Sequence, residues 1–91
     1  MAHSLSAKKR IKQNQVRRER NRARKRAIKT QVRKFTDAVR AHDVDKAEGE
    51  LRLAVKKLDQ TAAKGTLHKR AASRRKSRLA RQLNKLKAAS Q

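Results

Sequence analysis

Apolar residues recur at helical spacing in three separate stretches of this 91-residue chain. The first stretch places four of them on one face of a helix: Ile28, Val32, Phe35 and Val39. The second does the same with Val44, Ala47, Leu51, Val55, Leu58 and Ala62. The third does so with Ala72, Leu79, Leu83 and Leu86. Three amphipathic helices in succession are typical of a small bundle in which each stripe faces a shared core.

Two short segments interrupt this pattern and predict where the helices end. In AHDVD, residues 41–45, His42 is expected to cap the end of the first helix and Asp43 the start of the second. Further along, Gly65 can adopt the left-handed conformation that ends many helices, and Thr66 is expected to cap the next one. No segment alternates as a strand does. We therefore expect an all-α fold, a three-helix bundle that forms a single domain over residues 1–91.

The first helix is expected to continue to about residue 41, the second to span residues 44–64 and the third residues 67–88. A long basic arm, residues 1–27, forms the first part of the first helix and extends beyond the bundle. Gly49 lies inside the second helix, where it either allows close packing or is a tolerated cost. Leu53 is off its stripe and is expected to be exposed.

The excess of positive charge limits the kinds of partner that suit this chain. Lys and Arg number 29 against 7 acidic residues, and the formal net charge is +22. Residues 1–36 hold 14 cations and one acid, residues 37–59 hold five cations and six acids, and residues 60–91 hold ten cations and no acid. Such a chain repels itself and is suited to a polyanionic partner. Nucleic acid is the usual one, and a membrane surface is the other candidate.

Composition also argues against several classes of protein. The chain has no cysteine, and no apolar run reaches the roughly 18 residues of a membrane span or forms the core of a secretory signal. The three histidines, His3, His42 and His68, are scattered, so no metal site and no cofactor are expected. The acids cluster in the near-neutral middle without a pocket-forming core. We therefore expect no enzymatic activity and no small-molecule substrate.

Cations surround the arm on every side, and few apolar residues accompany them. We expect residues 1 to about 25 to be helical only when a partner neutralises them, because like charges at i,i+4 oppose a helix. The alternative is a disordered tail that binds polyanions loosely. The candidate RNA-binding residues of this part of the chain are Lys8, Lys9, Arg10, Lys12, Arg17, Arg18, Arg20, Asn21, Arg22, Arg24, Lys25, Arg26 and Lys29.

The third helix separates its apolar face from a row of cations. This arginine row consists of Arg70, Arg74, Arg78, Arg81 and Lys85. Arg75 is a further candidate contact on the same helix. A solvated surface would also place cations outward, but such surfaces usually intersperse acids, and none stands here. A phosphate at the turn from Gly65 to Lys69 would relieve cations at a helix start, and His68 is there either a packed residue or a phosphate contact.

The single aromatic residue limits how nucleic acid can be read. Phe35 lies on the core stripe, so no aromatic platform is expected for stacking splayed bases. We expect the protein to recognise backbone shape and phosphate position.

Three segments carry a resemblance to a known family: SAKKR at 6–10, the region from Asn21 to Arg24, and above all AAKGTLHKRAASRRKSRL at 62–79. Together they resemble the bacterial small-subunit ribosomal protein S20 family, over nearly the whole chain. The resemblance implies a three-helix bundle with a long first helix. It also implies direct binding to small-subunit (16S) ribosomal RNA, between the 5′ domain and the long penultimate helix, with neighbouring ribosomal proteins as further partners in the cytoplasmic ribosome.

Carried over by position, the resemblance implies ten RNA contacts: Lys8, Lys9, Arg10, Asn21, Arg24, Lys64, His68, Lys69, Arg74 and Lys76. We therefore predict a structural constituent of the small ribosomal subunit that stabilises folded ribosomal RNA. A DNA-compacting architectural protein is the alternative, although no exposed apolar wedge is placed for the minor groove. A membrane-active helix is disfavoured by the sparse apolar face of the arm.

Overall fold

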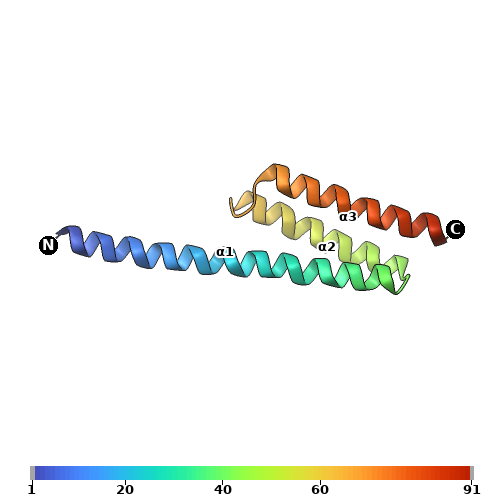
Figure 1. The fold of residues 1–91 in the computed structure, drawn as a ribbon, viewed down its shortest axis with the longest axis horizontal. Helices are drawn as coiled ribbons and strands as arrows, with labels where there is room; N and C mark the ends of the chain where they lie inside the picture. Colours follow the sequence, from blue (N-terminus) through green and yellow to red (C-terminus); the bar gives the residue numbers. More distant parts are fainter. Residues whose placement is uncertain (1, 91) are drawn as a thin grey trace.

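A computed structural model describes residues 2–90, with side chains from residue 5 onward, so the side chain of His3 lies outside the described residues. The chain forms α1 (Ala2–Arg40), α2 (Val44–Ala63) and α3 (Lys69–Ser90), and residues 2–90 contain no strand. The molecule measures 70 × 22 × 13 Å, because α1 runs on past the other two helices (Figure 1). The expected all-α three-helix bundle with a long first helix is confirmed.

The second helix lies in the middle of the bundle. α2 turns back along the C-terminal half of α1, and α3 turns again to lie along α2 (Figure 1). α1 and α3 share few direct contacts, so most of the packing passes through α2. The turn between α2 and α3 therefore comes to lie beside the middle of α1, where the arm leaves the bundle (Figure 1).

The buried core confirms much of the predicted apolar pattern. Phe35 and Leu58 are completely buried, and the predicted stripe of α3 is buried in full: Ala72, Leu79, Leu83 and Leu86. Several other predicted positions are only partly buried and pack against this core: Val32, Val39, Val44, Leu51 and Ala62. Leu53 is 49% exposed, as expected for a leucine away from the stripe. Since burial of one leucine stabilises a fold by about 1.5–3 kcal/mol, these residues hold the three helices together.

Several buried positions were not predicted. Gln31 and Ala38 of α1 are buried as well, because α1 packs on α2. Ala54 and Thr61 of α2 are also buried, because α2 packs against both neighbours and uses more than one face. The two polar side chains are satisfied by hydrogen bonds: Thr61 donates to the Lys57 carbonyl at 2.6 Å, and Gln31 Nε2 donates to the Glu50 carbonyl at 2.9 Å. Burial of these two groups therefore does not leave an unpaired polar atom.

The turn between α1 and α2 has the predicted caps. His42 has a φ of 58°, and its N–H donates to the carbonyl of Val39, while the N–H of Asp43 donates to that of Ala38. This pair of bonds is a Schellman motif, which satisfies the last carbonyls of α1. The Asp43 carboxylate then accepts from the Lys46 N–H at 3.2 Å and caps the start of α2.

The turn between α2 and α3 differs from the prediction at one residue. Gly65 has a φ of 78° and ends α2 in a second Schellman motif, as expected. Thr66, however, does not cap α3. His68 takes that place, since its Nδ1 accepts from the Arg70 N–H at 3.1 Å and its carbonyl accepts the first helical bond, from Ala72. The Thr66 hydroxyl instead bonds side chains of α1.

We expect substitution by alanine to have opposite effects at the two glycines. A Cβ at Gly49 would meet nothing within 4 Å, so close packing is not the reason for this glycine. We expect Gly49→Ala to stabilise the bundle by about 0.5–1 kcal/mol, since alanine is the better helix former. Gly65→Ala should destabilise it by about 1–2 kcal/mol, because alanine disfavours a positive φ. Urea denaturation followed by circular dichroism measures both, and a shift of the two variants in the same direction would contradict this account.

Candidate nucleic-acid interface

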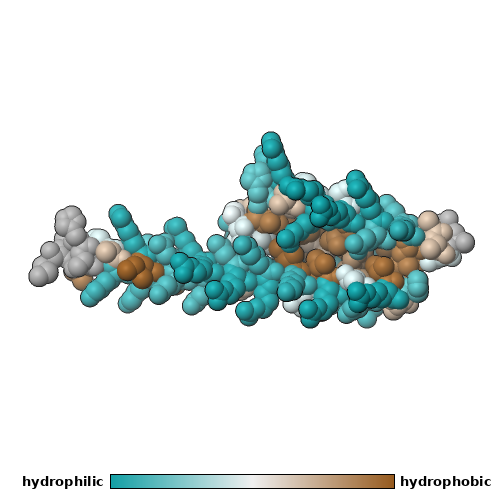
Figure 2. Space-filling view, viewed as in Figure 1, coloured by the Kyte–Doolittle hydropathy of each residue, from teal (hydrophilic) through white to brown (hydrophobic). Residues whose placement is uncertain are grey.

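The arm carries its cations in solvent. Residues 5–20 are all exposed, including the apolar side chains of Leu5, Ile11 and Val16. Hydrophilic residues cover most of the arm, whereas hydrophobic residues gather in the bundle (Figure 2). The predicted RNA-binding residues that lie exposed in the first half of α1 are Lys8, Lys9, Arg10, Lys12, Arg17, Arg18, Arg20 and Arg22. None of the described helices is long and apolar enough to cross a membrane.

Two predicted contact residues of α1 are held at the point where the arm meets the bundle. Asn21 and Arg24 are half-buried, and both bond Thr66 in the α2–α3 turn. The Thr66 hydroxyl donates to Asn21 Oδ1 at 2.8 Å and accepts from Arg24 Nη1 at 3.0 Å. Arg24 Nη1 also lies 3.3 Å from Asn21 Oδ1. These three side chains, called the junction triad below, join segments that are 42 to 45 residues apart in the sequence.

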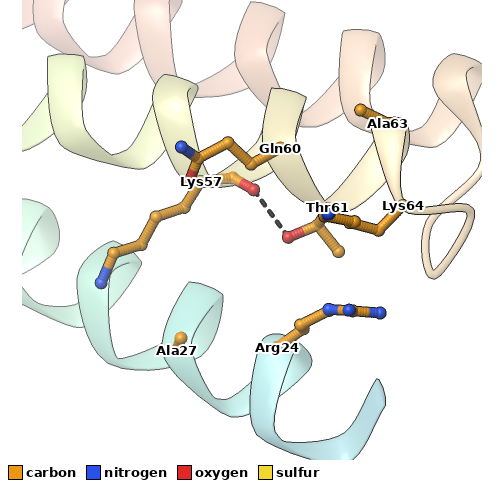
Figure 3. Close-up of a pocket in the computed structure, with 7 residues that line it drawn as sticks. All are labelled: Arg24, Ala27, Lys57, Gln60, Thr61, Ala63 and Lys64. Atoms are coloured by element: carbon orange, nitrogen blue, oxygen red, sulfur yellow. Dashed lines mark hydrogen bonds between the residues drawn. The ribbon is translucent and has the colours of Figure 1, made fainter. Parts of the chain in front are cut away.

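Two adjoining hollows flank Arg24, and cations line both. One, of about 300 Å³, is lined by Arg17, Arg20, Asn21, Arg24, Lys64 and Gly65. The other, of about 490 Å³, lies between α1 and α2, where Arg24 and Ala27 face Lys57, Thr61 and Lys64 (Figure 3). Sequence reasoning missed Lys57, which it placed in the near-neutral segment 37–59. The helical spacing of residues 57, 60, 61 and 64 was the signal that could have placed it beside Lys64.

A third hollow, of about 750 Å³, runs between α1 and α3. Its floor includes the apolar residues Ile28 and Leu79, which are 3% and 6% exposed, and its cations are Lys25, Lys29, Arg75 and Arg78. His68 lies in the wall of the same groove, and its side chain is exposed, so the interpretation as a packed residue was wrong. Four predicted contacts from two helices therefore face one groove. Arg26, the remaining candidate RNA contact in this part of α1, is exposed but does not line this groove.

The arginine row of α3 points away from the core. Its members are exposed, as are the predicted contacts at the start of the helix and before it: Lys64, Lys69, Arg70, Arg74, Arg78, Arg81 and Lys85. The two ion pairs among the described residues involve other cations of α3, with Lys76 Nζ 2.7 Å from Asp59 Oδ1 and Lys87 paired with Glu48. Lys76 is thus half-buried against α2 and engaged within the molecule, unlike the other predicted contacts of α3, which are exposed.

The pair between Lys87 and Glu48 changes the titration of the carboxyl group. A hydrogen bond from Lys87 and the charge of that lysine lower the pKa of Glu48. The pair therefore contributes to stability above the ordinary carboxyl pKa, and the contribution is lost as the pH falls through the lowered value. Since the pair lies at the surface, its effect is small.

The hollows bring many positive charges together without a counter-charge. Nine cations and no acid line the three of them: Arg17, Arg20, Arg24, Lys25, Lys29, Lys57, Lys64, Arg75 and Arg78. Most of the acids lie elsewhere, at the end of α1, in the turn that follows it and in the first half of α2: Asp37, Asp43, Asp45, Glu48 and Glu50. Among the described residues no cluster of three or more His, Cys, Asp or Glu could hold a metal ion. The arrangement is suited to phosphate groups of a polyanion.

Comparisons with known proteins agree on one family. The model of the family described as ribosomal protein S20 matches residues 2–84. A protein of Shouchella clausii named small ribosomal subunit protein bS20 is 50% identical over 88 residues, which is 97% of this chain and 100% of that protein. Proteins of the same name are 48% identical in Desulforudis audaxviator, over 92% of this chain and 96% of that protein, and in Geobacillus thermodenitrificans, over 97% and 99%.

Proposed function

The chain belongs to the ribosomal protein S20 family, as the residues at 62–79 predicted, and from this premise we propose that it binds 16S ribosomal RNA directly and stabilises its folded form. It is a structural, non-enzymatic protein of the small ribosomal subunit. Its place of action is then the ribosome in the cytoplasm, and its principal partner is the RNA.

One observation carries this proposal: the two basic segments of the chain, at opposite ends of the sequence, meet around the α2–α3 turn. Arg17, Arg20 and Arg24 come from α1, and Lys64 comes from the turn, yet all four line one hollow. No acid lines it, so this concentration of like charge opposes the packed state of the free chain. Phosphates of a folded RNA would remove that repulsion and release counterions from the RNA.

The surface supports recognition of shape over base identity. Phe35 is the single residue among Phe, Tyr and Trp and is completely buried, so none of these large aromatic rings is exposed for stacking. The cations instead extend from the exposed arm through the junction to the arginine row of α3. An array of this kind suits phosphates that a folded RNA holds at fixed positions, and a flexible strand gains less from it.

Competition binding at physiological salt tests the proposal. Folded 16S ribosomal RNA should compete better than duplex DNA of equal total phosphate by about a hundredfold or more, in keeping with the gap between specific and non-specific nucleic-acid binding. The same RNA cut into short fragments is the matched control, because it keeps composition and charge but loses the fold, and it should compete as poorly as DNA. Equal affinity for the folded RNA and the DNA would contradict the proposal and favour a DNA-compacting protein.

A further inference from the structure

We propose that Asn21 and Thr66 are positioning residues, which hold Arg24 and fix the arm to the α2–α3 turn before RNA binds. The inference rests on the proposed RNA binding for its purpose, but it assigns the contact to the free protein. It therefore departs from the sequence-based expectation for residues 21–24, which was that a partner is needed for them to be helical. The resemblance to the S20 family, carried over by position, implies that Asn21 contacts RNA. The structure assigns its side-chain oxygen a different task, as an acceptor inside the junction triad.

The triad is the last tertiary contact before the arm becomes fully exposed. Ile28 is the first buried apolar residue of α1, and residues 5–20 are all exposed. Between these lie the half-buried Asn21, Arg24 and Ala27. With so little apolar burial on these roughly two turns of helix, side-chain hydrogen bonds to Thr66 are what tie the segment to the rest of the molecule. A hydrogen-bonded contact of this kind also has a preferred geometry, so it sets the direction in which the arm leaves the bundle.

The residue types fit this task better than they fit helix formation. Asparagine is among the poorer helix formers, yet Asn21 stands within a helix of 39 residues, where alanine would favour the local structure. Its Oδ1 accepts from both Thr66 and Arg24, which is a use that alanine cannot replace. Thr66 is likewise spared from capping α3, because His68 does so. Each side chain is therefore used for the long-range contact instead of a local one.

The triad leaves most of Arg24 available to a ligand. The recorded bonds of Arg24 use Nη1 alone, and a guanidinium group has donors on Nε and Nη2 as well. Arg24 lines both hollows beside the turn, with Lys64 common to the two. A guanidinium group held from one side presents its remaining donors in a fixed orientation, which suits a phosphate oxygen. Loss of the triad should therefore keep the positive charge of Arg24. RNA binding would then have to order the Arg24 side chain, and this loss of conformational freedom weakens the affinity.

Three charge-neutral variants test this inference in the free protein: Asn21→Ala, Thr66→Val and the double variant. Backbone NMR with amide hydrogen exchange is read at residues 17–24. We expect Thr66→Val to raise exchange in this segment about threefold to tenfold, the size of one part-buried hydrogen bond, although the substitution is in another element. Thr30→Val is the matched control, because Thr30 is exposed on α1, and it should leave the segment unchanged. Unchanged exchange at residues 17–24 in Thr66→Val would overturn the inference, whatever the protein binds.

Binding to 16S ribosomal RNA supplies the second readout. Each single variant should bind about threefold to tenfold more weakly with an unchanged salt slope, since no cation is removed. The double variant should be no weaker than Thr66→Val alone, because loss of the Thr66 hydroxyl already removes both bonds between α1 and the turn. Fully additive effects would show two independent RNA contacts and overturn the positioning role. Tighter binding by Asn21→Ala would also overturn it, because helix propensity alone would then decide. Failure of the parent protein to select 16S RNA would instead contradict the proposed function and leave the exchange result standing.

Discussion

Replacing Leu79 and Leu83 by alanine is expected to unfold the bundle in the absence of RNA. Both side chains are 6% exposed and belong to the core that joins α3 to α2. Each truncation of a buried leucine reduces the free energy of unfolding by about 2–5 kcal/mol, and domains of this kind are stable by only about 5–15 kcal/mol in total. The net charge of +22 makes the compact state less favourable still. Circular dichroism with urea titration measures the loss of helix and the shift of the midpoint.

Leu53→Ala is the matched control for these leucines, since its side chain is 49% exposed. It should change the free energy of unfolding by less than about 0.5 kcal/mol. RNA affinity of the double leucine variant should fall, because binding must now drive folding, but the salt slope should stay near that of the parent, because every cation is retained. A folded double variant with parental stability would contradict the assignment of these leucines to the core.

Replacing Arg74 and Arg78 by alanine is expected to leave the bundle folded and to weaken RNA binding. Both side chains are exposed, and neither takes part in the ion pairs recorded among residues 5–90. Helix content should be kept or raised, because repulsion between like charges at i,i+4 falls. RNA binding should weaken, and the salt slope should flatten by up to about 0.7–0.9 log unit per lost phosphate contact. Salt titrations of RNA binding, with circular dichroism beside them, measure both quantities.

A control variant of the same helix removes the same amount of positive charge. Lys76→Ala with Lys87→Ala also removes two cations, but these two are paired with Asp59 and Glu48 of α2. This variant should keep most of the salt slope, because its cations are already engaged within the protein. If both double variants flatten the salt slope equally, the slope depends only on the net charge of the protein. The arginine row would then be a solvated surface without specific phosphate contacts.

The residues around the α2–α3 turn show where reasoning from sequence succeeded and where it stopped. The left-handed Gly65 and the end of α2 followed from local backbone preferences. The role of Thr66 did not, since a hydroxyl after a helix end can bond either the next helix or a distant side chain. Its partners Asn21 and Arg24 are 45 and 42 residues away, and no local rule connects them.

Sequence by itself determined the three helices, the capping roles of His42 and Asp43, and the buried stripe of α3, because each depends on periodicity or on backbone preferences within a few residues. It also determined that the cations far outnumber the acids. Only the tertiary structure decided which charges meet. It placed Lys57 beside Arg24 and turned Lys76 toward Asp59, because those neighbours depend on the angle and register at which α2 packs between α1 and α3. The same packing buried Gln31 and Thr61, whose polarity predicts exposure until a hydrogen-bond partner is in place.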